Sequence, residues 1–208
     1  MTRMRHLAPI GVLAACTLAL GGCALLGGGK PANLYRFGQS TVGDPAPASA
    51  QSVGVFRAAG PFQRESAGDR ILTVTGGKAA YIAETRWVAP ASTLFNQAAT
   101  AAFDADTGPV RLVSRGEPGQ ASYVLRLEVR NFETRYDQGP KAAPVVVVRV
   151  RATLSPRQAQ EVREQMFESQ VRADGNRVSG IVAAYDQAVT EVLGAVVTWT
   201  NAEAKPTA

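Results

Sequence analysis

The sequence predicts an α/β fold, a single layered domain in which two main helices pack on a mostly antiparallel or mixed sheet. Three observations lead to this fold class. Apolar residues recur with helical spacing over 91–104 and 178–199. Two central stretches, 123–132 and 145–154, alternate apolar with charged or polar residues, as half-buried strands do. A Gly-Gly pair at 76–77 joins two further strand candidates.

The N-terminal region has the pattern of a secretory signal. Arg3 and Arg5 precede an uncharged apolar run over 7–20, which has about the length of a signal-peptide hydrophobic region and is short for a membrane span. The run ends in Leu20-Gly21-Gly22-Cys23, which resembles the lipobox of bacterial lipoproteins, where the Cys thiol receives diacylglycerol. We therefore expect 1–22 to be a signal peptide and Cys23 to be the lipidated residue.

A second cysteine leaves an alternative cleavage site. Leu13-Ala14-Ala15-Cys16 also matches the box, but cleavage there would leave the apolar stub 17–20 on the mature chain and a hydrophobic region broken by Pro9. Cys23 is therefore favoured, and an uncleaved signal anchor is the remaining alternative. Residues 23–33 then form the lipidated Cys and a flexible Gly-rich spacer, whose ten residues after Cys23 span at most about 33–36 Å.

The residue after Cys23 bears on the location of the protein. In the bacterial lipoproteins that this segment resembles, Asp at that position favours retention in the inner membrane, whereas this chain has Ala24. The resemblance therefore implies an outer-membrane protein, lipid-anchored with its domain at the periplasmic face.

Composition limits the chemistry of the mature chain. After loss of 1–22, 186 residues remain (208 − 22), which is enough for one domain with a core, and the formal charge falls from +5 to +3. No Cys follows Cys23, and the single His, His6, lies in the signal. Catalysis by Cys-His or Ser-His-Asp and an ordinary zinc site are thereby excluded. We expect a protein that is not an enzyme, with no cofactor and, because it is exported, no nucleic-acid partner.

Carboxylates leave one enzymatic alternative. A hydrolase could use Asp104, Asp106, Asp137 or Asp174, but three of these lie in turn-like sequence, where Asp has an ordinary structural role. Two converging buried carboxylates in a pocket would support this alternative.

The first half of the domain contains short strands and one helix. We expect strands at 34–37 and 53–57, separated by a Pro- and Ala-rich loop over 41–52. A hairpin follows, with strands at 70–75 and 78–85. Pro90 then occupies the position where the first turn of the helix over 91–104 begins. Thr107-Gly108-Pro109 ends this helix, and 110–113 is a strand.

The second half contains the clearest elements. In strand 123–132 the apolar residues share one face and Arg126, Glu128 and Arg130 share the other, and strand 145–154 repeats this with Arg149 and Arg151. A polar segment from Ser155-Pro156 predicts a short helix or an insertion before a strand at 166–172. The helix over 178–199 has a wide apolar stripe that favours burial against the sheet. We expect the domain to cover 34–201 and a disordered tail to follow over 202–208.

The order of these elements resembles the ABC-type transport auxiliary lipoproteins, a family that includes the paraquat-inducible protein C group. The resemblance covers nearly the whole mature chain and depends on order and spacing. Two departures are an Ala- and Thr-rich helix after Pro90 and an extended segment over 155–165. The stretches that carry it are the lipobox ending at Cys23, Leu34-Tyr35-Arg36-Phe37, Ala80-Tyr81 through Arg86-Trp87 to Pro90, and Phe167 with Ala183-Ala184-Tyr185, Val192-Leu193 and Trp199.

The resemblance implies a non-enzymatic lipoprotein that works beside an ABC transporter whose substrate-binding component carries a mammalian-cell-entry domain. Such systems move phospholipid or other hydrophobic molecules between the inner and outer membranes, and the lipoprotein would dock the periplasmic component at the outer membrane. The resemblance also implies a Rossmann-like or TolB-N-terminal-like layering and a homo-oligomer. The alternative is an outer-membrane structural or assembly lipoprotein unrelated to lipid transport.

Three residues are candidates for partner docking. Trp87, Val88 and Leu94 lie at the junction before and within the first helix, and they would serve docking if this stretch were exposed. The competing interpretation places Leu94 in the core and Trp87 as a packed junction residue. The arginine faces of the two long strands could meet acidic partner loops or lipid headgroups, or form a solvated sheet face.

Overall fold

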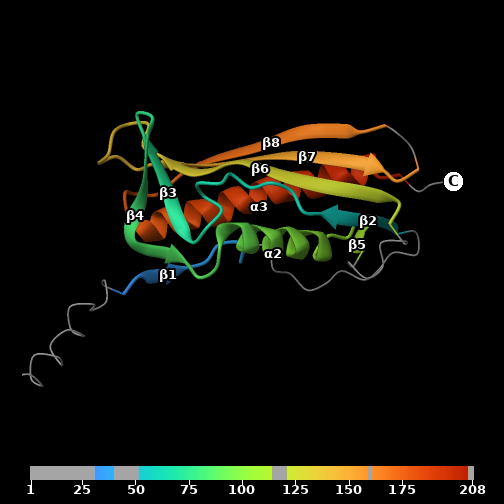
Figure 1. The fold of residues 1–208 in the computed structure, drawn as a ribbon, viewed down its shortest axis with the longest axis horizontal. Coiled ribbons are helices and arrows are strands. Elements are labelled where there is room, and N and C mark those ends of the chain that lie inside the picture. The colour runs from blue at the N-terminus through green and yellow to red at the C-terminus, as the bar shows by residue number, and fades with distance from the viewer. Residues whose placement is uncertain (1–30, 40–51, 114–120, 159–160, 206–208) are drawn as a thin grey trace, which may run out of the picture. The chain divides into compact units, whose positions relative to one another are not determined.

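The domain that follows the predicted spacer contains all the regular elements described below. The computed structural model describes residues 31–39, 52–113, 121–158 and 161–205 (Figure 1). The chain divides into two compact units, Met1–Pro31 and Ala32–Ala208, and the second is the domain. The predicted signal peptide, Cys23 and nearly all of the loop over 41–52 lie outside the described residues, so the interpretations of these segments stay predictions.

Eight strands and two helices are present within the described residues. In chain order they are β1 (Asn33–Tyr35), β2 (Val53–Ala58), β3 (Arg70–Thr75), β4 (Lys78–Trp87), α2 (Ala91–Asp104), β5 (Val110–Val113), β6 (Tyr123–Arg135), β7 (Val145–Pro156), β8 (Arg163–Arg172) and α3 (Val178–Glu203). All strands join one sheet. The predicted α/β fold with a mixed sheet and two main helices is therefore confirmed.

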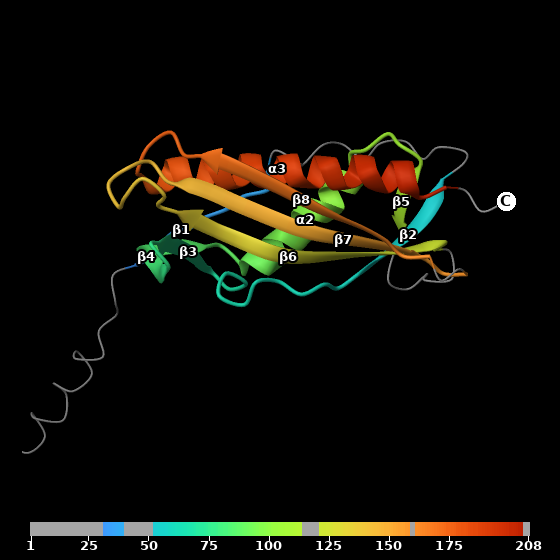
Figure 2. The same cartoon turned by 90° about the horizontal axis from the view of Figure 1, so that it is seen from above.

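Strand β6 is the centre of the sheet. One edge of β6 pairs antiparallel with β7, and β7 pairs antiparallel with β8. Its other edge is shared, because β2 pairs parallel with the start of β6 and β3 pairs parallel with its end, with a single bridge from Phe62 to Val129 between them. β5 lies parallel beside β2, and β4 and β1 continue the sheet beyond β3. The sheet therefore divides into two branches along one edge of β6 (Figures 1 and 2).

The long strands extend beyond their predicted ends. Alternation in β6 shifts at a bulge between Val129 and Asn131, after which Phe132 and Thr134 face the core. The bulge moves the core-facing side chains from odd-numbered to even-numbered positions, and β6 continues to Arg135. On β7, pairing with β6 reaches Pro156, which occupies the last position of the strand, where a missing N–H is tolerated. The segment after it forms no helix among the residues described.

The β3–β4 hairpin is confirmed with its predicted turn. Gly76 and Gly77 both have positive φ angles, 54° and 80°, which glycine adopts without the steric penalty of a side chain. β4 keeps β3 as a partner to its end, where Arg86 faces Arg70 after a bulge, and Thr85 to Trp87 also pair with β1 on the other edge of β4. This second pairing places the residues before α2 beside the first strand of the domain.

Helix α2 has the predicted bounds, whereas α3 is longer than predicted. α3 continues to Glu203, and Ala204 after it is only 2% exposed. The amide of Asn201 binds β5 through Val110 N–H at 3.1 Å and the Asp106 carboxylate at 2.8 Å. The disordered tail predicted from Ala202 is therefore wrong for residues 202–205, because long-range contacts that the periodicity does not encode fix this last turn.

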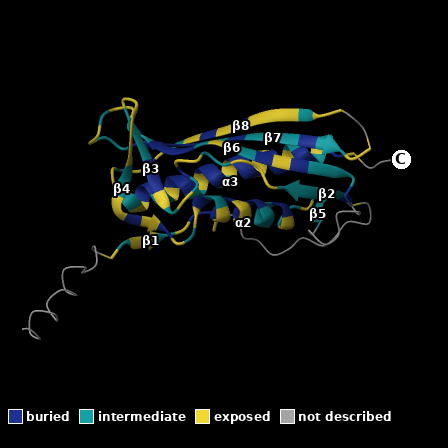
Figure 3. Ribbon diagram, viewed as in Figure 1, coloured by how far each residue is buried: buried dark blue, intermediate teal, exposed yellow. Residues whose placement is uncertain are grey.

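Both helices pack into one core on the inward face of the sheet (Figure 3). A chain of aromatic contacts runs from Phe95 of α2 through Phe62 and Phe132 to Tyr185 of α3. The Thr134 hydroxyl donates a hydrogen bond to the phenol oxygen of Tyr185 at 3.2 Å, and burial raises the pKa of this phenol. These contacts join the two helices to the middle of the sheet.

Helix α3 has the length and composition of a membrane span. The hydropathy of its most apolar window is 1.3, but 56% of that window is buried inside the domain. Buried core helices of this kind have the same composition. The predicted packing of this helix on the sheet is confirmed by its contacts with β7 and β8.

Candidate functional site

The outer face of β6, β7 and β8 carries a ladder of paired charges. Arg149 binds Glu168, and Arg151 binds Glu164 on the neighbouring strand. The hydrogen bond from Arg151 holds the pKa of Glu164 below its usual range. Arg149 faces Glu168 and Arg151 faces Glu128 across the strand ladders, and Glu164 lies diagonally opposite Arg151, so the charges of Arg149 and Arg151 are paired within the sheet. This face resembles a solvated sheet surface more than a site that awaits an acidic partner.

The predicted docking stretch divides between core and surface. Trp87 is 2% exposed and makes edge contacts with Phe37 and Tyr185, at ring-centroid distances of 4.9 Å and 5.2 Å. Leu94 is 3% exposed on the inward side of α2, whereas Val88 is 52% exposed. Exposure, the condition on which docking by this stretch depends, is therefore met by Val88 alone among the three.

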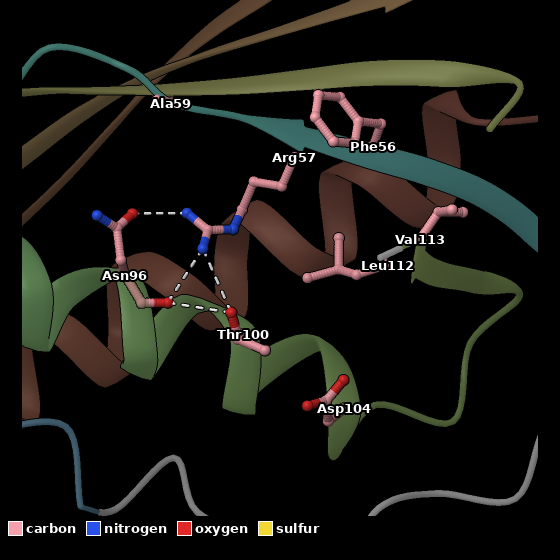
Figure 4. Close-up of a pocket in the computed structure, with 8 residues that line it drawn as sticks. All are labelled: Phe56, Arg57, Ala59, Asn96, Thr100, Asp104, Leu112 and Val113. Atoms are coloured by element: carbon pink, nitrogen blue, oxygen red, sulfur yellow. Dashed lines mark hydrogen bonds between the residues drawn. The ribbon is translucent and has the colours of Figure 1, made fainter. Parts of the chain in front are cut away.

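A hollow of about 430 Å³ lies between α2 and the strands β2 and β5 (Figure 4). Arg57 crosses it from β2 to the helix. Its guanidinium donates to the side-chain oxygen of Asn96 at 2.6 Å and to the hydroxyl of Thr100 at 3.3 Å. Leu112 and Val113 line the side formed by β5, and Asp104 lies one turn further along α2. The hollow therefore combines hydrogen-bonding groups from α2 with apolar groups from β5.

A second hollow, of about 530 Å³, extends over the outward side of α2. We call this side the α2 face and define it by Thr93, Asn96, Gln97, Thr100 and Asp104. Asp104 is the single charged residue of α2, the other residues of the α2 face are neutral hydrogen-bonding groups, and Arg57 of β2 also lines this hollow. A solvated helix usually carries charges on its outer side, whereas the centres of protein interfaces are depleted in them. The α2 face therefore has the composition of a contact surface.

Glu133 is the buried carboxylate among the described residues, with 6% exposure. Burial alone would raise its pKa, but hydrogen bonds from Gln63 and Arg135, together with the charge of Arg135, lower the pKa below its ordinary value. The same Gln63 accepts the backbone N–H of Phe132 at 2.8 Å, so this network attaches the segment after β2 to β6. The hydrogen-bond network around Glu133 therefore has a structural role.

The carboxylates considered for hydrolysis do not form a buried pair. Asp137 is bound by Arg172 at 2.7 Å, Asp174 by Arg177 at 2.6 Å, and Asp106 by Asn201. Across the described parts of the chain, no group of three or more His, Cys, Asp or Glu side chains could hold a metal ion.

The α2 face is the surface that the sequence interpretation missed. Its signal was present, because the helix over 91–104 has a polar side with one charge and is rich in Ala and Thr. That composition alone does not distinguish a docking face from a helix packed on both sides. The hollows beside Arg57 and Asn96 provide the missing information.

Residues 67–197 match the model of the family described as ABC-type transport auxiliary lipoprotein component. The chain belongs to this family. The match runs from before β3 to the last turns of α3, so it includes the hairpin, the α2 face and the charged strands. The family is an auxiliary component of ABC-type transport and a family of lipoproteins, which implies a membrane-anchored protein associated with a transporter.

Two solved structures share the fold of this family member. The crystal structure of XCC0632 from Xanthomonas campestris, assigned to family DUF330, is 26% identical with a TM-score of 0.68, over 82% of this chain and 95% of that chain. A second crystal structure, of an uncharacterised protein, is 12% identical with a TM-score of 0.63, over 82% and 99% of the two chains. The second likeness shows the fold alone. A search among curated proteins gave no match.

Proposed function

We propose that this protein is a non-enzymatic outer-membrane lipoprotein, anchored through lipid on Cys23, that is accessory to a mammalian-cell-entry-type ABC system for lipid transport between membranes. In this role it docks the periplasmic component of the transporter at the outer membrane. The observation that carries the proposal is the family match over residues 67–197. It favours transport over the alternative of a structural or assembly lipoprotein.

The proposed docking surface is the α2 face. It lies directly after the junction at Trp87 and Val88, where the sequence predicted docking, and Trp87 and Leu94 support it from the core. Neutral amides and hydroxyls can form hydrogen bonds with a partner without the desolvation cost of buried charges. The outer sheet face, in contrast, presents charges, which pair with one another. On the α2 face, Asn96 and Thr100 accept hydrogen bonds from Arg57 and Gln97 accepts one from Arg36, so a partner meets neutral groups that are held in place.

The anchor is tested by labelling with palmitate. Cys23→Ser should abolish labelling and release the domain from membranes, whereas Cys16→Ser should retain both. Density-gradient separation of the wild-type membranes should place the protein with the outer membrane. Labelling that survives Cys23→Ser and disappears in Cys16→Ser would show that the cleavage site is wrong, and recovery with the inner membrane would contradict the proposed location.

Docking is tested by co-purification of the intact lipoprotein with the transporter's periplasmic component. Thr93→Arg introduces a charge at the α2 face and should strongly weaken association, while Gln165→Arg, on exposed β8, is the matched control and should not. Equal association of both variants and wild type would reject the α2 face. No association of the wild-type protein at low salt would count against docking through the domain.

The transported substrate and the assembly need separate measurements. Permease, ATPase and mammalian-cell-entry genes beside this gene would support lipid transport, whereas secretin or polysaccharide-export neighbours would favour the assembly alternative. Light scattering of the lipoprotein in detergent gives its oligomeric state, for which the family resemblance implies more than one copy.

A further inference from the structure

Two exposed apolar side chains lie together at the first strand of the domain. Leu34 is 62% exposed and Val88 is 52% exposed. β1 pairs parallel with the end of β4, so Leu34 faces Arg86 in the ladder, and the Val88 N–H donates to the Tyr35 carbonyl at 2.8 Å. Tyr35 and Trp87 alternate with these residues and pack against the core. Leu34, Arg86 and Val88 therefore turn away from the core on one side of the ladder.

Guanidinium groups flank the apolar pair. Arg36 follows Leu34 by two residues, is exposed and donates to the neutral Gln97 side chain at 3.2 Å. Arg86 pairs with Asp69 at 2.8 Å and keeps 46% of its side chain exposed. We call Leu34, Arg36, Arg86 and Val88 the anchor-end patch. Aliphatic groups beside arginines suit the membrane interface, where the apolar groups enter the headgroup region and guanidiniums bind phosphates.

The length of the chain before β1 supports a lipid occupant. Leu34 follows Cys23 by 11 residues (34 − 23), so the patch lies within about 36–40 Å of a lipid anchor on that sulfur. A tether of this length keeps the effective concentration of membrane surface near the patch high, so that a weak contact is populated. The positive balance of the patch, two guanidiniums against the Asp69 carboxylate, complements anionic headgroups.

We propose that the anchor-end patch rests on the membrane that holds the lipid anchor, with Leu34 and Val88 in the headgroup region and Arg36 and Arg86 at anionic phosphates. The proposal rests on lipidation of Cys23 and adds a defined orientation of the domain. It assigns Val88 to lipid contact and leaves the α2 face to the protein partner.

The structure supplies matched controls for a test. Val162 is 57% exposed and Met166 is 48% exposed, values close to those of Leu34 and Val88. Met166 lies on β8, and Val162 directly precedes this strand. β1 and β8 form opposite edges of the sheet. A non-specific response of exposed apolar positions would therefore affect all four residues, whereas an oriented domain affects only the first pair.

The experiment uses the mature lipidated chain in vesicles of phosphatidylethanolamine and phosphatidylglycerol that contain a nitroxide-labelled lipid. Because Cys16 leaves with the signal and Cys23 carries lipid, an introduced cysteine is the free thiol to which a fluorophore is attached. Leu34→Cys and Val88→Cys labels should shift to shorter wavelength and be quenched, while Val162→Cys and Met166→Cys labels should do neither. Arg36→Gln or high salt should reduce quenching at the first pair.

Several results would overturn the proposal. Equal quenching at all four positions would indicate no orientation, and no quenching at Leu34→Cys or Val88→Cys in protein that floats with the vesicles would exclude membrane contact. A wavelength shift without quenching by the nitroxide lipid would show that a second copy or another protein segment covers the patch. Failure of the protein to float is a distinct result, because it refutes the lipid anchor itself and both proposals with it.

Discussion

Replacing Trp87 by alanine should lower the free energy of unfolding of the domain, in addition to any effect on partner docking. The indole is 2% exposed and lies edge-on to both Phe37 and Tyr185. Truncation of a buried Trp or Phe to alanine costs about 3–5 kcal/mol, from lost transfer free energy and the cavity that remains. Each edge-to-face aromatic contact contributes about 0.5–1.5 kcal/mol in addition to the free energy expected from buried area. We therefore expect a loss of about 4 kcal/mol for Trp87→Ala.

Urea unfolding, followed by tryptophan fluorescence and circular dichroism, measures this loss in the soluble Cys23→Ser protein. With a slope of about 2 kcal/mol per M, the midpoint should fall by about 2 M. Val88→Ala removes the neighbouring exposed side chain and should change the unfolding free energy by less than about 0.5 kcal/mol. Equal midpoints for Trp87→Ala and wild type would refute the core assignment, and Trp87→Phe should recover part of the loss.

Three further predictions concern the buried carboxylate, the close backbone approach and the last turn of α3. Since the folded-state pKa of Glu133 lies below its ordinary value of 4.5, its stabilisation is present above that pH and is lost as the pH falls through the folded-state pKa. The stability gap between wild type and Glu133→Gln, about 1–3 kcal/mol at neutral pH, should therefore shrink on acidification in urea titrations below pH 4.5. A Cβ at Gly60 would lie 1.9 Å from the Leu127 carbonyl oxygen, so Gly60→Ala should lower the midpoint of thermal unfolding. A Cβ at Gly194 would meet open space, so Gly194→Ala should add about 0.5–1 kcal/mol to the free energy of unfolding. Equal effects of the two substitutions would contradict this geometry. Asn201→Ala should lower the free energy of unfolding by about 1–3 kcal/mol in the same urea assay. Truncation after Trp199 should lower it further, because it removes both the hydrogen bond to β5 and the buried Ala204. A truncated chain as stable as wild type would refute a structural role for that turn.

Local chemistry explains why most elements could be predicted. The two glycines at 76 and 77 accept positive φ angles, so the hairpin turn follows from residue type. The apolar stripe of α3 and the alternation of β6 and β7 follow from periods of 3.6 and 2 residues. The ends of β6 and α3 do not follow from these periods. A bulge carries β6 on to Arg135, and the hydrogen bonds of Asn201 hold the last turn of α3, through contacts between residues distant in sequence.

The docking prediction depended on information that the local sequence does not contain. Trp87, Val88 and Leu94 are close in sequence and similar in hydrophobicity, but the direction in which each side chain points depends on the pairing of the end of β4 with both β3 and β1 and on the packing of α2. Likewise, the polar side of α2 lines a hollow together with Arg57 of β2, which donates a hydrogen bond to Asn96. Arg57 and Asn96 are 39 positions apart, and Asn33 and Thr85, which face each other between β1 and β4, are 52 positions apart (85 − 33).

Residue types and spacing were enough to predict the fold class, the two helices, the hairpin, the absence of His and of further Cys after Cys23, and the family resemblance that the match over 67–197 confirms. These features depend on residue type and short-range period. Three features depend on the three-dimensional arrangement: the division of the sheet into two branches beside β6, the burial of Trp87 and Leu94, and the position of Leu34 and Val88 on neighbouring segments at one edge. The physical reason is that burial and pairing depend on which strands become neighbours, and parallel pairing between distant segments leaves no local pattern in the chain.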